Sequence, residues 1–300
     1  MPSEESKQLI ETMRSQPPFP EGTLPEMRAG MEATARPADS DIIVEETTAG
    51  GVPAKYFTAP GADTSRVLLY FHGGGYVIGS TVSHAWLLGA LSRATDTQVL
   101  ALDYRLAPEH PFPAAVEDAV AAYQSLLDSG YAARDIAIGG DSAGGGLTAA
   151  ALVSIRERGL AMPAAGVLLS PWTDLAGTGA SITERASRDP LISDVSMINM
   201  MADHYVGDDK ATNPLVSPLY ADLAGLPPLL IQVGTEEVLY DDSTRLDARA
   251  RAAGVESTFE PWDGQVHVFQ MQGWMVPEGQ QAIDHIGEFV KSKLGALAAV

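Results

Sequence analysis

The sequence contains no cysteine, which excludes disulfide bonds, thiol nucleophiles and cysteine-bound metal clusters. It is also poor in basic residues, with 19 Lys and Arg against 39 Asp and Glu and a formal net charge of −20. A chain this acidic repels the phosphates of nucleic acids and of anionic membrane surfaces. No apolar run approaches the roughly 20 residues of a membrane helix, and residues 1–11 lack the apolar stretch of a secretory signal. We therefore expect a cytoplasmic protein without nucleic-acid or membrane partners.

Repeats and low-complexity tracts are lacking too, and the remaining composition is that of a folded domain. The 300 residues are 45% hydrophobic and 19% charged. A chain of this length can bury one large core, or one core and a small appended domain.

Short apolar runs alternate with helical patterns along most of the chain. Two β-rich runs at 41–48 and 52–58 flank Gly50-Gly51 and predict a hairpin. Buried strands are predicted at 67–71, 99–104, 136–139, 167–169, 229–233 and 256–260, and helices at 82–95, 114–129, 143–158, 241–253 and 280–297. This alternation predicts an α/β fold whose mostly parallel central sheet is flanked by helices on both faces.

The segment 185–225 interrupts the alternation with three prolines and the cluster Met197, Met200 and Met201. Methionine fills irregular gaps in cores and also adapts to varied ligands. The segment is therefore either a lid over the sheet or a helical insertion filled with core methionines. Residues 4–16 and 24–36 predict two short helices before the hairpin, and these belong to the lid on the first reading.

A serine stands in a glycine-rich turn between a predicted strand and a predicted helix. Gly140-Asp141-Ser142-Ala143-Gly144 matches G-x-S-x-G, and this setting is the one that a nucleophile elbow requires. The glycines relieve crowding around the sharp turn, and the helix start offers free N–H groups to a developing anion. The alternatives are a packing turn and a phosphate-binding loop, but the latter lacks G-x-G-x-x-G spacing and a Walker lysine.

A histidine followed by three glycines comes directly after the first buried strand, at His72-Gly73-Gly74-Gly75. Ester hydrolysis passes through a tetrahedral oxyanion, and each backbone N–H aimed at it contributes about 3 kcal/mol. Glycines let the backbone approach closely and turn its N–H groups inward. We expect Gly73 and Gly74 as donors of this oxyanion hole, with the N–H of Ala143 as the third. His72 is expected to brace the loop by hydrogen bonding rather than to act as a base.

The two motifs, in this order, resemble those of the bacterial hormone-sensitive-lipase-like esterases of the α/β-hydrolase superfamily. Further blocks of the chain are similar to that family: Tyr104-Arg105-Leu106-Ala107-Pro108, Ser170-Pro171-Trp172-Thr173-Asp174 and Ser217-Pro218-Leu219. The resemblance implies a catalytic core at 41–184 and 226–300, cap helices at 1–40 and a second cap segment at 185–225. It also implies a homodimer and the hydrolysis of short- to medium-chain carboxylic esters.

The chain offers one histidine in a suitable loop. In this fold the catalytic residues follow the order serine, acid, histidine. His267 follows a predicted strand and resembles the family's His-x-Phe block, whereas His204 lies in the lid-like segment and His285 inside the closing helix. We therefore expect His267 to be the base, against the alternative of a loop histidine that caps the following helix.

The acid departs from the family's pattern. The family shows Asp-Pro-Leu with a second Asp four residues after the first, and here the stretch is Glu237-Val238-Leu239-Tyr240-Asp241. Aligning the leucines puts Glu237 in the catalytic position, with Asp241 as a competitor and Glu236 as a weaker one. A glutamate suits the role, because the acid only orients the imidazole and stabilises its cation.

These residues predict a serine hydrolase without a metal or cofactor. Ser142 attacks the ester carbonyl, His267 takes its proton and later protonates the departing alcohol, and water releases the acid. No His-x-x-x-His or His-Glu-x-x-His metal spacing occurs. Trp86, Met201 and Tyr205 are candidate substrate-binding residues, although burial in the core explains each equally well.

Three rival functions remain on the sequence alone. A ligand receptor on this fold, such as the plant gibberellin receptors, lacks a working histidine, whereas here both Ser142 and His267 are present. Acyl transfer to an alcohol or amide hydrolysis uses the same residues and is not separated by fold or motif. A lipase acting on long-chain lipid at an interface is disfavoured by the acidic chain.

Overall fold

The computed structural model describes residues 1–15 and 22–295. Its centre is one eight-stranded sheet with the order β1-β2-β4-β3-β5-β6-β7-β8. The predicted hairpin β1–β2 is antiparallel and joins the sheet antiparallel to β4, while the pairs from β4 through β8 are parallel. The strands are β1 (Ile43–Ala49), β2 (Val52–Thr58), β3 (Asp63–Phe71), β4 (Thr97–Leu102), β5 (Ile136–Asp141), β6 (Ala165–Leu169), β7 (Leu229–Gly234) and β8 (Ser257–Trp262).

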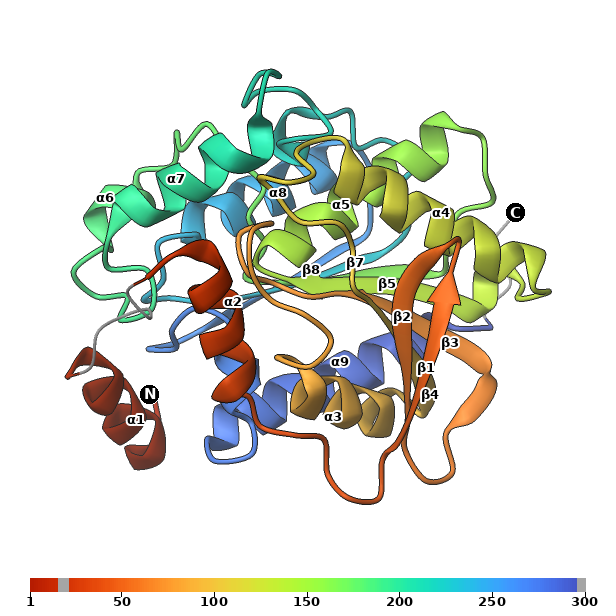
Figure 1. Ribbon diagram of the computed structural model, residues 1–300, viewed down its shortest axis with the longest axis horizontal. Helices are drawn as coiled ribbons and strands as arrows, with labels where there is room; N and C mark the ends of the chain where they lie inside the picture. The colour runs from red at the N-terminus through yellow and green to blue at the C-terminus, as the bar shows by residue number, and fades with distance from the viewer. Residues whose placement is uncertain (16–21, 296–300) are drawn as a thin grey trace.

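Helices cover both faces of the sheet, as the alternation predicts. Figure 1 shows α4, α5 and α8 on one face, and α3 and α9 on the other. The α-helices are α1 (Glu4–Arg14), α2 (Leu24–Ala33), α3 (Ala85–Thr95), α4 (Ala114–Asp128), α5 (Ala143–Glu157), α6 (Ser181–Glu184), α7 (Val195–Val206), α8 (Tyr240–Ala252) and α9 (Pro277–Lys293). Short 3₁₀ turns lie at Ala133–Asp135, Pro218–Tyr220 and Phe269–Gln272.

Strand β3 illustrates why the central runs are uniformly apolar. Val67, Leu69 and Phe71 pack into the core on one face of the sheet. Leu68 and Tyr70 pack into the core on the other face. Because successive side chains alternate between two covered faces, a central parallel strand needs an apolar residue at every position.

Element types match the sequence expectations, and the differences lie at the ends. Helix α3 begins at Ala85 rather than at residue 82, because Ser80 and Ser83 hydrogen-bond one another in a turn that precedes it. Strand β4 ends at Leu102 rather than at residue 104, and the side chain of the next residue, Asp103, accepts hydrogen bonds from the N–H and hydroxyl of Thr81. Residue 16 of the first expected helix and residues 296 and 297 of the last lie outside the described residues.

Segments far apart in the sequence gather at one end of the sheet. Figure 1 places α1, α2, α6 and α7 at the same end of the molecule. Arg14 of α1 donates a hydrogen bond to the carbonyl of Arg188, which follows α6. Within the described residues, no helix combines the length and hydropathy needed to cross a bilayer.

Candidate active site

Ser142 lies at the sharp turn between β5 and α5. Its backbone adopts φ 54° and ψ −119°, a conformation that costs a non-glycine residue on the order of 1–3 kcal/mol. Backbone hydrogen bonds hold it there: its N–H donates to Leu169 O at 2.8 Å, and its carbonyl accepts from Trp172 N at 2.9 Å. A side chain at Gly144 would collide with the carbonyl of Phe71, so the approach of α5 to β3 requires glycine. The turn thereby presents the serine hydroxyl to a cavity.

The structure brings Ser142, His267 and Glu237 into one hydrogen-bonded line. Nε2 of His267 lies 2.9 Å from the hydroxyl oxygen of Ser142, and its Nδ1 lies 2.7 Å from Oε2 of Glu237. His267 stands on the loop after β8, and Glu237 on the loop after β7. The two competing acids lie elsewhere, because Asp241 accepts from the N–H of Ser181 and Glu236 lies 3.6 Å from Arg188.

Glu237 is fully buried, and its second oxygen is held by two donors. Oε1 accepts from Ser170 Oγ at 2.8 Å and from Gly234 N at 2.6 Å. Ser170 Oγ also accepts from the N–H of Val268, which follows His267. Ser170 therefore ties the acid to the histidine loop. The signal for it in the sequence was its place at the head of the Ser170–Asp174 block.

The imidazole of His267 binds a proton more tightly than a free histidine does. Burial opposes the cation, but the hydrogen bond and negative charge of Glu237 outweigh it and raise the pKa of His267 above its ordinary value. A base with such a pKa accepts the serine proton readily.

A second buried carboxylate, Asp189, lies next to this line and was not anticipated. It accepts hydrogen bonds from the N–H groups of Leu191, Ile192 and Val238. Burial raises the pKa of Asp189 above its ordinary value, and the opposing charge of His267 only reduces this increase. Asp189 thus joins the segment before α7 to the residue after Glu237, and only the tertiary fold reveals the connection.

The glycine loop after β3 is built differently from the expectation. The N–H of Gly73 donates to Oδ1 of Asp141 at 3.1 Å, so this expected oxyanion donor is engaged inside the protein. Gly74 and Gly75 line the cavity with φ angles of 115° and 62°, which favour glycine. Ala143 is the first residue of α5, where helix N–H groups lack intrahelical partners.

His72 braces this loop, as expected. Its Nδ1 lies 2.7 Å from the carbonyl oxygen of Gly73, and its carbonyl accepts from the hydroxyl of Tyr104. The two rings stack with centroids 4.4 Å apart. Burial and the neighbouring His84 lower the pKa of His72 to about 4, which leaves it neutral at neutral pH.

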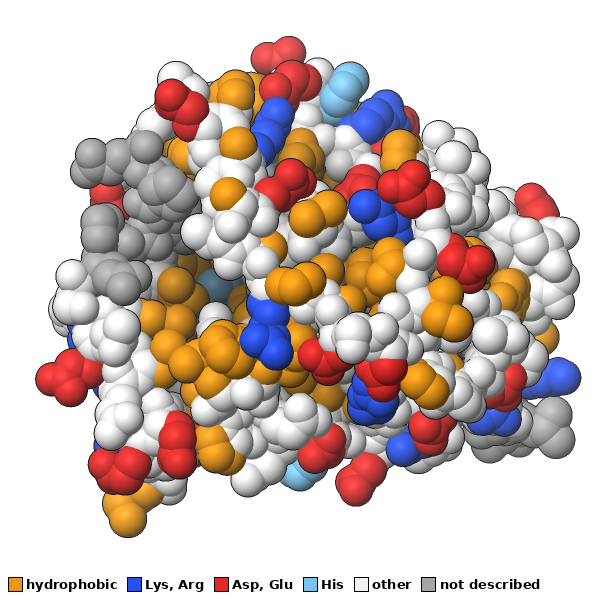
Figure 2. All heavy atoms as spheres, turned by 60° about the horizontal axis from the view of Figure 1, so that its bottom comes forward, with side chains coloured by type: hydrophobic (Ala, Val, Ile, Leu, Met, Phe, Trp, Pro, Cys, Tyr) orange, Lys and Arg blue, Asp and Glu red, His pale blue; other side chains and the backbone are white. Residues whose placement is uncertain are grey.

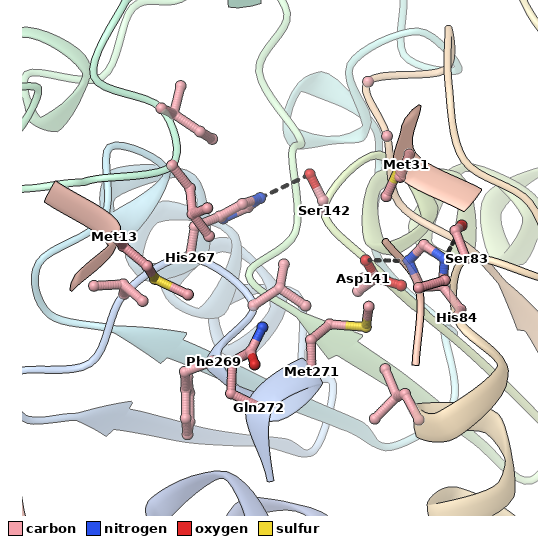
Figure 3. Close-up of a pocket in the computed structure, with 18 of the residues that line it drawn as sticks. Met13, Met31, Ser83, His84, Asp141, Ser142, His267, Phe269, Met271 and Gln272 are labelled. Atoms are coloured by element: carbon pink, nitrogen blue, oxygen red, sulfur yellow. Dashed lines mark hydrogen bonds and ion pairs between the residues drawn. The ribbon is translucent and has the colours of Figure 1, made fainter. Parts of the chain in front are cut away.

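A cavity of about 400 Å³ opens over Ser142. Figure 2 shows a hollow bordered mostly by hydrophobic side chains, and Figure 3 shows Ser142 and His267 facing one another in it. Of the three candidate binding residues, Trp86 and Met201 line the cavity. Its other large apolar walls come from Met13, Met31, Trp172, Leu191, Ile192, Met197, Ile198, Phe269, Met271 and Trp274.

Tyr205, the third candidate, does not line the cavity. One turn beyond Met201 on α7, its ring stacks on Tyr76 with centroids 3.7 Å apart and meets Phe112 edge to face. The side chain is 1% exposed. Its ring therefore packs in the core and not among the residues that line the cavity.

Known proteins share both the sequence pattern and the fold. Residues 68–271 match a family described as alpha/beta hydrolase fold. An acetyl-hydrolase of Streptomyces hygroscopicus is 48% identical over 79% of this chain and 79% of its own. A crystal structure described as an esterase from the bacterial hormone-sensitive lipase family has a TM-score of 0.94 at 49% identity, covering 98% of this chain and 100% of its own. A similar structure, with the same TM-score, identity and coverage, is of an esterase soaked with p-nitrophenyl butyrate.

Proposed function

The chain belongs to the alpha/beta hydrolase fold family, among the esterases of the bacterial hormone-sensitive-lipase group, and we propose that it hydrolyses carboxylic esters through an acyl-enzyme on Ser142. The observation that carries the proposal is the imidazole of His267, which lies within hydrogen-bond distance of both Ser142 and Glu237. An imidazole with a hydroxyl on one nitrogen and a buried carboxylate on the other is poised to take the hydroxyl proton.

The reaction then proceeds in two halves. His267 removes the proton of Ser142 as its oxygen attacks the ester carbonyl, and the carboxylate of Glu237 stabilises the imidazolium. His267 returns the proton to the departing alcohol, which leaves the acyl group on Ser142. The same histidine then activates water, and attack by this water releases the carboxylic acid and restores the serine.

The oxyanion formed in each half is assigned to backbone N–H groups of the glycine loop and of α5. We place Gly74, Gly75 and Ala143 in this role. Gly73, which the sequence pattern favoured, gives its N–H to Asp141 and serves as the anchor of the loop. Each donor aimed at the oxyanion contributes about 3 kcal/mol to the transition state.

The substrate lies between the sheet and a cap made of residues 1–40 and 185–225. Met13 and Met31 from the first segment and Met197 and Met201 from the second line the cavity. Methionine side chains adapt to ligands of different shape. A cavity of about 400 Å³ with apolar walls suits small esters with short to medium acyl chains.

Turnover of p-nitrophenyl acetate, butyrate, octanoate and palmitate by the purified protein, beside Ser142→Ala, tests the proposal. We expect hydrolysis of the short esters and a loss of about 10³-fold or more in kcat for the variant. Activity that survives in Ser142→Ala, or its lack on every chain length in the wild type, would refute the mechanism.

A further inference from the structure

The residue before the nucleophile, Asp141, is a buried carboxylate that the reaction does not use. It ends β5 and is 2% exposed. Its Oδ1 accepts from the hydroxyl of Tyr70 at 2.9 Å and from the N–H of Gly73 at 3.1 Å. The same N–H lies 3.3 Å from Nε2 of His84, a longer contact to a nitrogen that itself faces Asp141. A Cβ atom at Gly73 would collide with this carboxylate, so the loop and Asp141 are in direct contact.

The other oxygen of Asp141 faces an imidazole. Nε2 of His84 lies 3.3 Å from Oδ2, and His84 is also 2% exposed. On its far side, Nδ1 of His84 lies 2.9 Å from Ser83 Oγ and 3.2 Å from the carbonyl of Ser80. Figure 3 shows Ser83, His84 and Asp141 in a row beside Ser142.

This row is not a second nucleophile site. Ser83 Oγ donates to the carbonyl of Ser80 at 2.8 Å and accepts from the N–H of Ser80 at 2.9 Å, so its hydroxyl closes the turn before α3. The row therefore runs from a fixed turn, through His84 and Asp141, to the N–H of Gly73. Its end point is the loop that carries Gly74 and Gly75.

We propose that Asp141 and His84 are positioning residues for the oxyanion hole, an inference that rests on the proposed function. Asp141 accepts a hydrogen bond from the N–H of Gly73. This bond fixes the loop so that the N–H groups of Gly74 and Gly75 face the cavity. His84 pairs with the carboxylate and neutralises it. The pair thereby combines a rigid anchor with neutralisation of the negative charge of Asp141.

Neutralisation matters because Asp141 adjoins Ser142. An unpaired carboxylate at this depth would repel the oxyanion that forms on the substrate, and electrostatic interactions are strong in a buried site. Burial raises the pKa of Asp141, but the charge of His84 and hydrogen bonds outweigh it and lower the pKa. Burial lowers the pKa of His84, but the charge of Asp141 outweighs it and raises the pKa. Both directions favour the ionised pair.

Steady-state kinetics with p-nitrophenyl butyrate separate positioning from mere stability. Asp141→Ala removes the anchor, and we expect kcat to fall about 100-fold, the effect of one lost oxyanion donor, with KM within about threefold. Asp141→Asn keeps an acceptor for Gly73, and we expect it to recover at least about tenfold of that loss. The matched control is Asp118→Ala. Asp118 is a buried carboxylate of α4 that accepts a hydrogen bond from Arg105, and we expect the kcat of this variant to stay near that of the wild type.

The charge role has its own test. His84→Gln leaves the carboxylate unpaired, and we expect kcat to fall about tenfold or more at unchanged KM. Adding Asp141→Asn to this variant removes the unpaired charge, so the double variant should exceed His84→Gln in kcat. Equal losses in Asp141→Ala and Asp118→Ala, or a double variant poorer than His84→Gln, would overturn the proposal.

Amide hydrogen exchange at Gly73 reports the anchor without any turnover. We expect slow exchange in the wild type, Asp118→Ala and Asp141→Asn, and fast exchange in Asp141→Ala. Slow exchange that persists in Asp141→Ala would refute the anchor even if the enzyme is an esterase. Conversely, lack of turnover in the wild type would refute the proposed function. The exchange data would still show whether Asp141 holds the N–H of Gly73.

Discussion

At the scale of single residues, Glu237 stands where the related family pattern has aspartate. Its carboxylate spans from Gly234 N and Ser170 Oγ to His267 Nδ1, and each of these contacts is 2.6 to 2.8 Å long. The longer side chain of glutamate therefore has its far oxygen fixed by donors from two places, the end of β7 and the residue after β6. Two donors on one oxygen leave the other free for the imidazole.

Glu237→Gln should lower kcat by about 10³- to 10⁴-fold, because the amide no longer enforces the correct tautomer or stabilises the imidazolium. It should also move the acidic limb of the pH–rate profile. His267 acts as a base only when neutral, so activity falls as the pH drops through its raised pKa. Without the carboxylate this pKa falls, and the limb shifts to lower pH. Profiles of kcat/KM from pH 5 to 9 measure both effects.

The control variants for this prediction are Asp241→Asn and Glu236→Gln. In the wild type, Asp241 accepts from the N–H of Ser181, and Glu236 lies 3.6 Å from Arg188. We expect both to keep kcat near the wild type. A large loss in Asp241→Asn with normal Glu237→Gln would give the role to Asp241 instead.

Residue types in the motifs could be predicted from the sequence, but their individual contacts could not. The glycine motif predicted Gly73 as an oxyanion donor, yet Gly73 donates to Asp141, a contact between the ends of β3 and β5 that no local pattern records. Tyr205 shows the same limit. It was a candidate substrate-binding residue with core burial as the alternative, and stacking on Tyr76 places it in the core.

At the scale of elements, α1 docks on the loop that carries His267. Ser6 Oγ donates to Oε1 of Gln265 at 3.1 Å, and Ile10 packs against Val266 and Phe269. The helix thereby places Met13 in the wall of the cavity. Figure 1 shows α1 at the edge of the molecule. Its ends are held as well, because Ser3 donates to the carboxylate of Glu278 and Arg14 to the carbonyl of Arg188.

Ile10→Ala should loosen α1 selectively, since loss of a buried isoleucine costs about 2–5 kcal/mol and Ile10 is the apolar residue of α1 that is buried against the histidine loop. Displacement of Met13 removes apolar surface that only longer acyl chains reach. We expect KM for p-nitrophenyl octanoate to rise about fivefold, which corresponds to a loss of about 1 kcal/mol of apolar binding energy. KM for p-nitrophenyl acetate should stay unchanged. Gln8→Ala, at an exposed position of the same helix, is the control. Equal changes for acetate and octanoate would contradict a role of α1 in the cavity wall.

Element boundaries show where sequence patterns stop being informative. Strand β3 begins at Asp63, four residues before its apolar run, because Asp63 pairs with Thr97 across an irregularity in the ladder. Its first three residues are exposed and polar, so hydrophobicity alone does not mark them. Helix α9 begins at Pro277, where proline suits the first turn, rather than at residue 280.

At the scale of the whole molecule, the α/β class followed from the alternation, but the strand order did not. Sequence order gives no reason for β4 to lie between β2 and β3, since each strand there is a similar apolar run. The order is decided by pairing between distant residues, such as Tyr56 with Leu100 and Leu69 with Ile138. The gathering of α1, α2, α6 and α7 at one end of the sheet likewise depends on tertiary contacts.

Stability of the whole molecule should depend on pH through a buried acid outside the reaction. Asp242, at the start of α8, is fully buried and accepts from the N–H groups of Thr173 and Asp174. Burial raises the pKa of Asp242 to about 8 from an ordinary value of 3.8. The folded protein therefore keeps a proton on this group that the unfolded chain loses.

The direction of the pH dependence follows from this difference in protonation between the folded and unfolded states. Below pH 3.8 the group is protonated in both states, and between 3.8 and about 8 only the folded state holds the proton, so the free energy of unfolding falls as the pH rises through this window. Asp242→Asn keeps an acceptor without a titration, and we expect a higher thermal midpoint at pH 8 and a flatter dependence from pH 5 to 8, measured by calorimetry. Asp208→Asn makes the same substitution at an exposed position and should follow the wild-type slope. Parallel curves for the wild type and Asp242→Asn would show that Asp242 is ionised in the folded protein, with the N–H groups of Thr173 and Asp174 stabilising the charge.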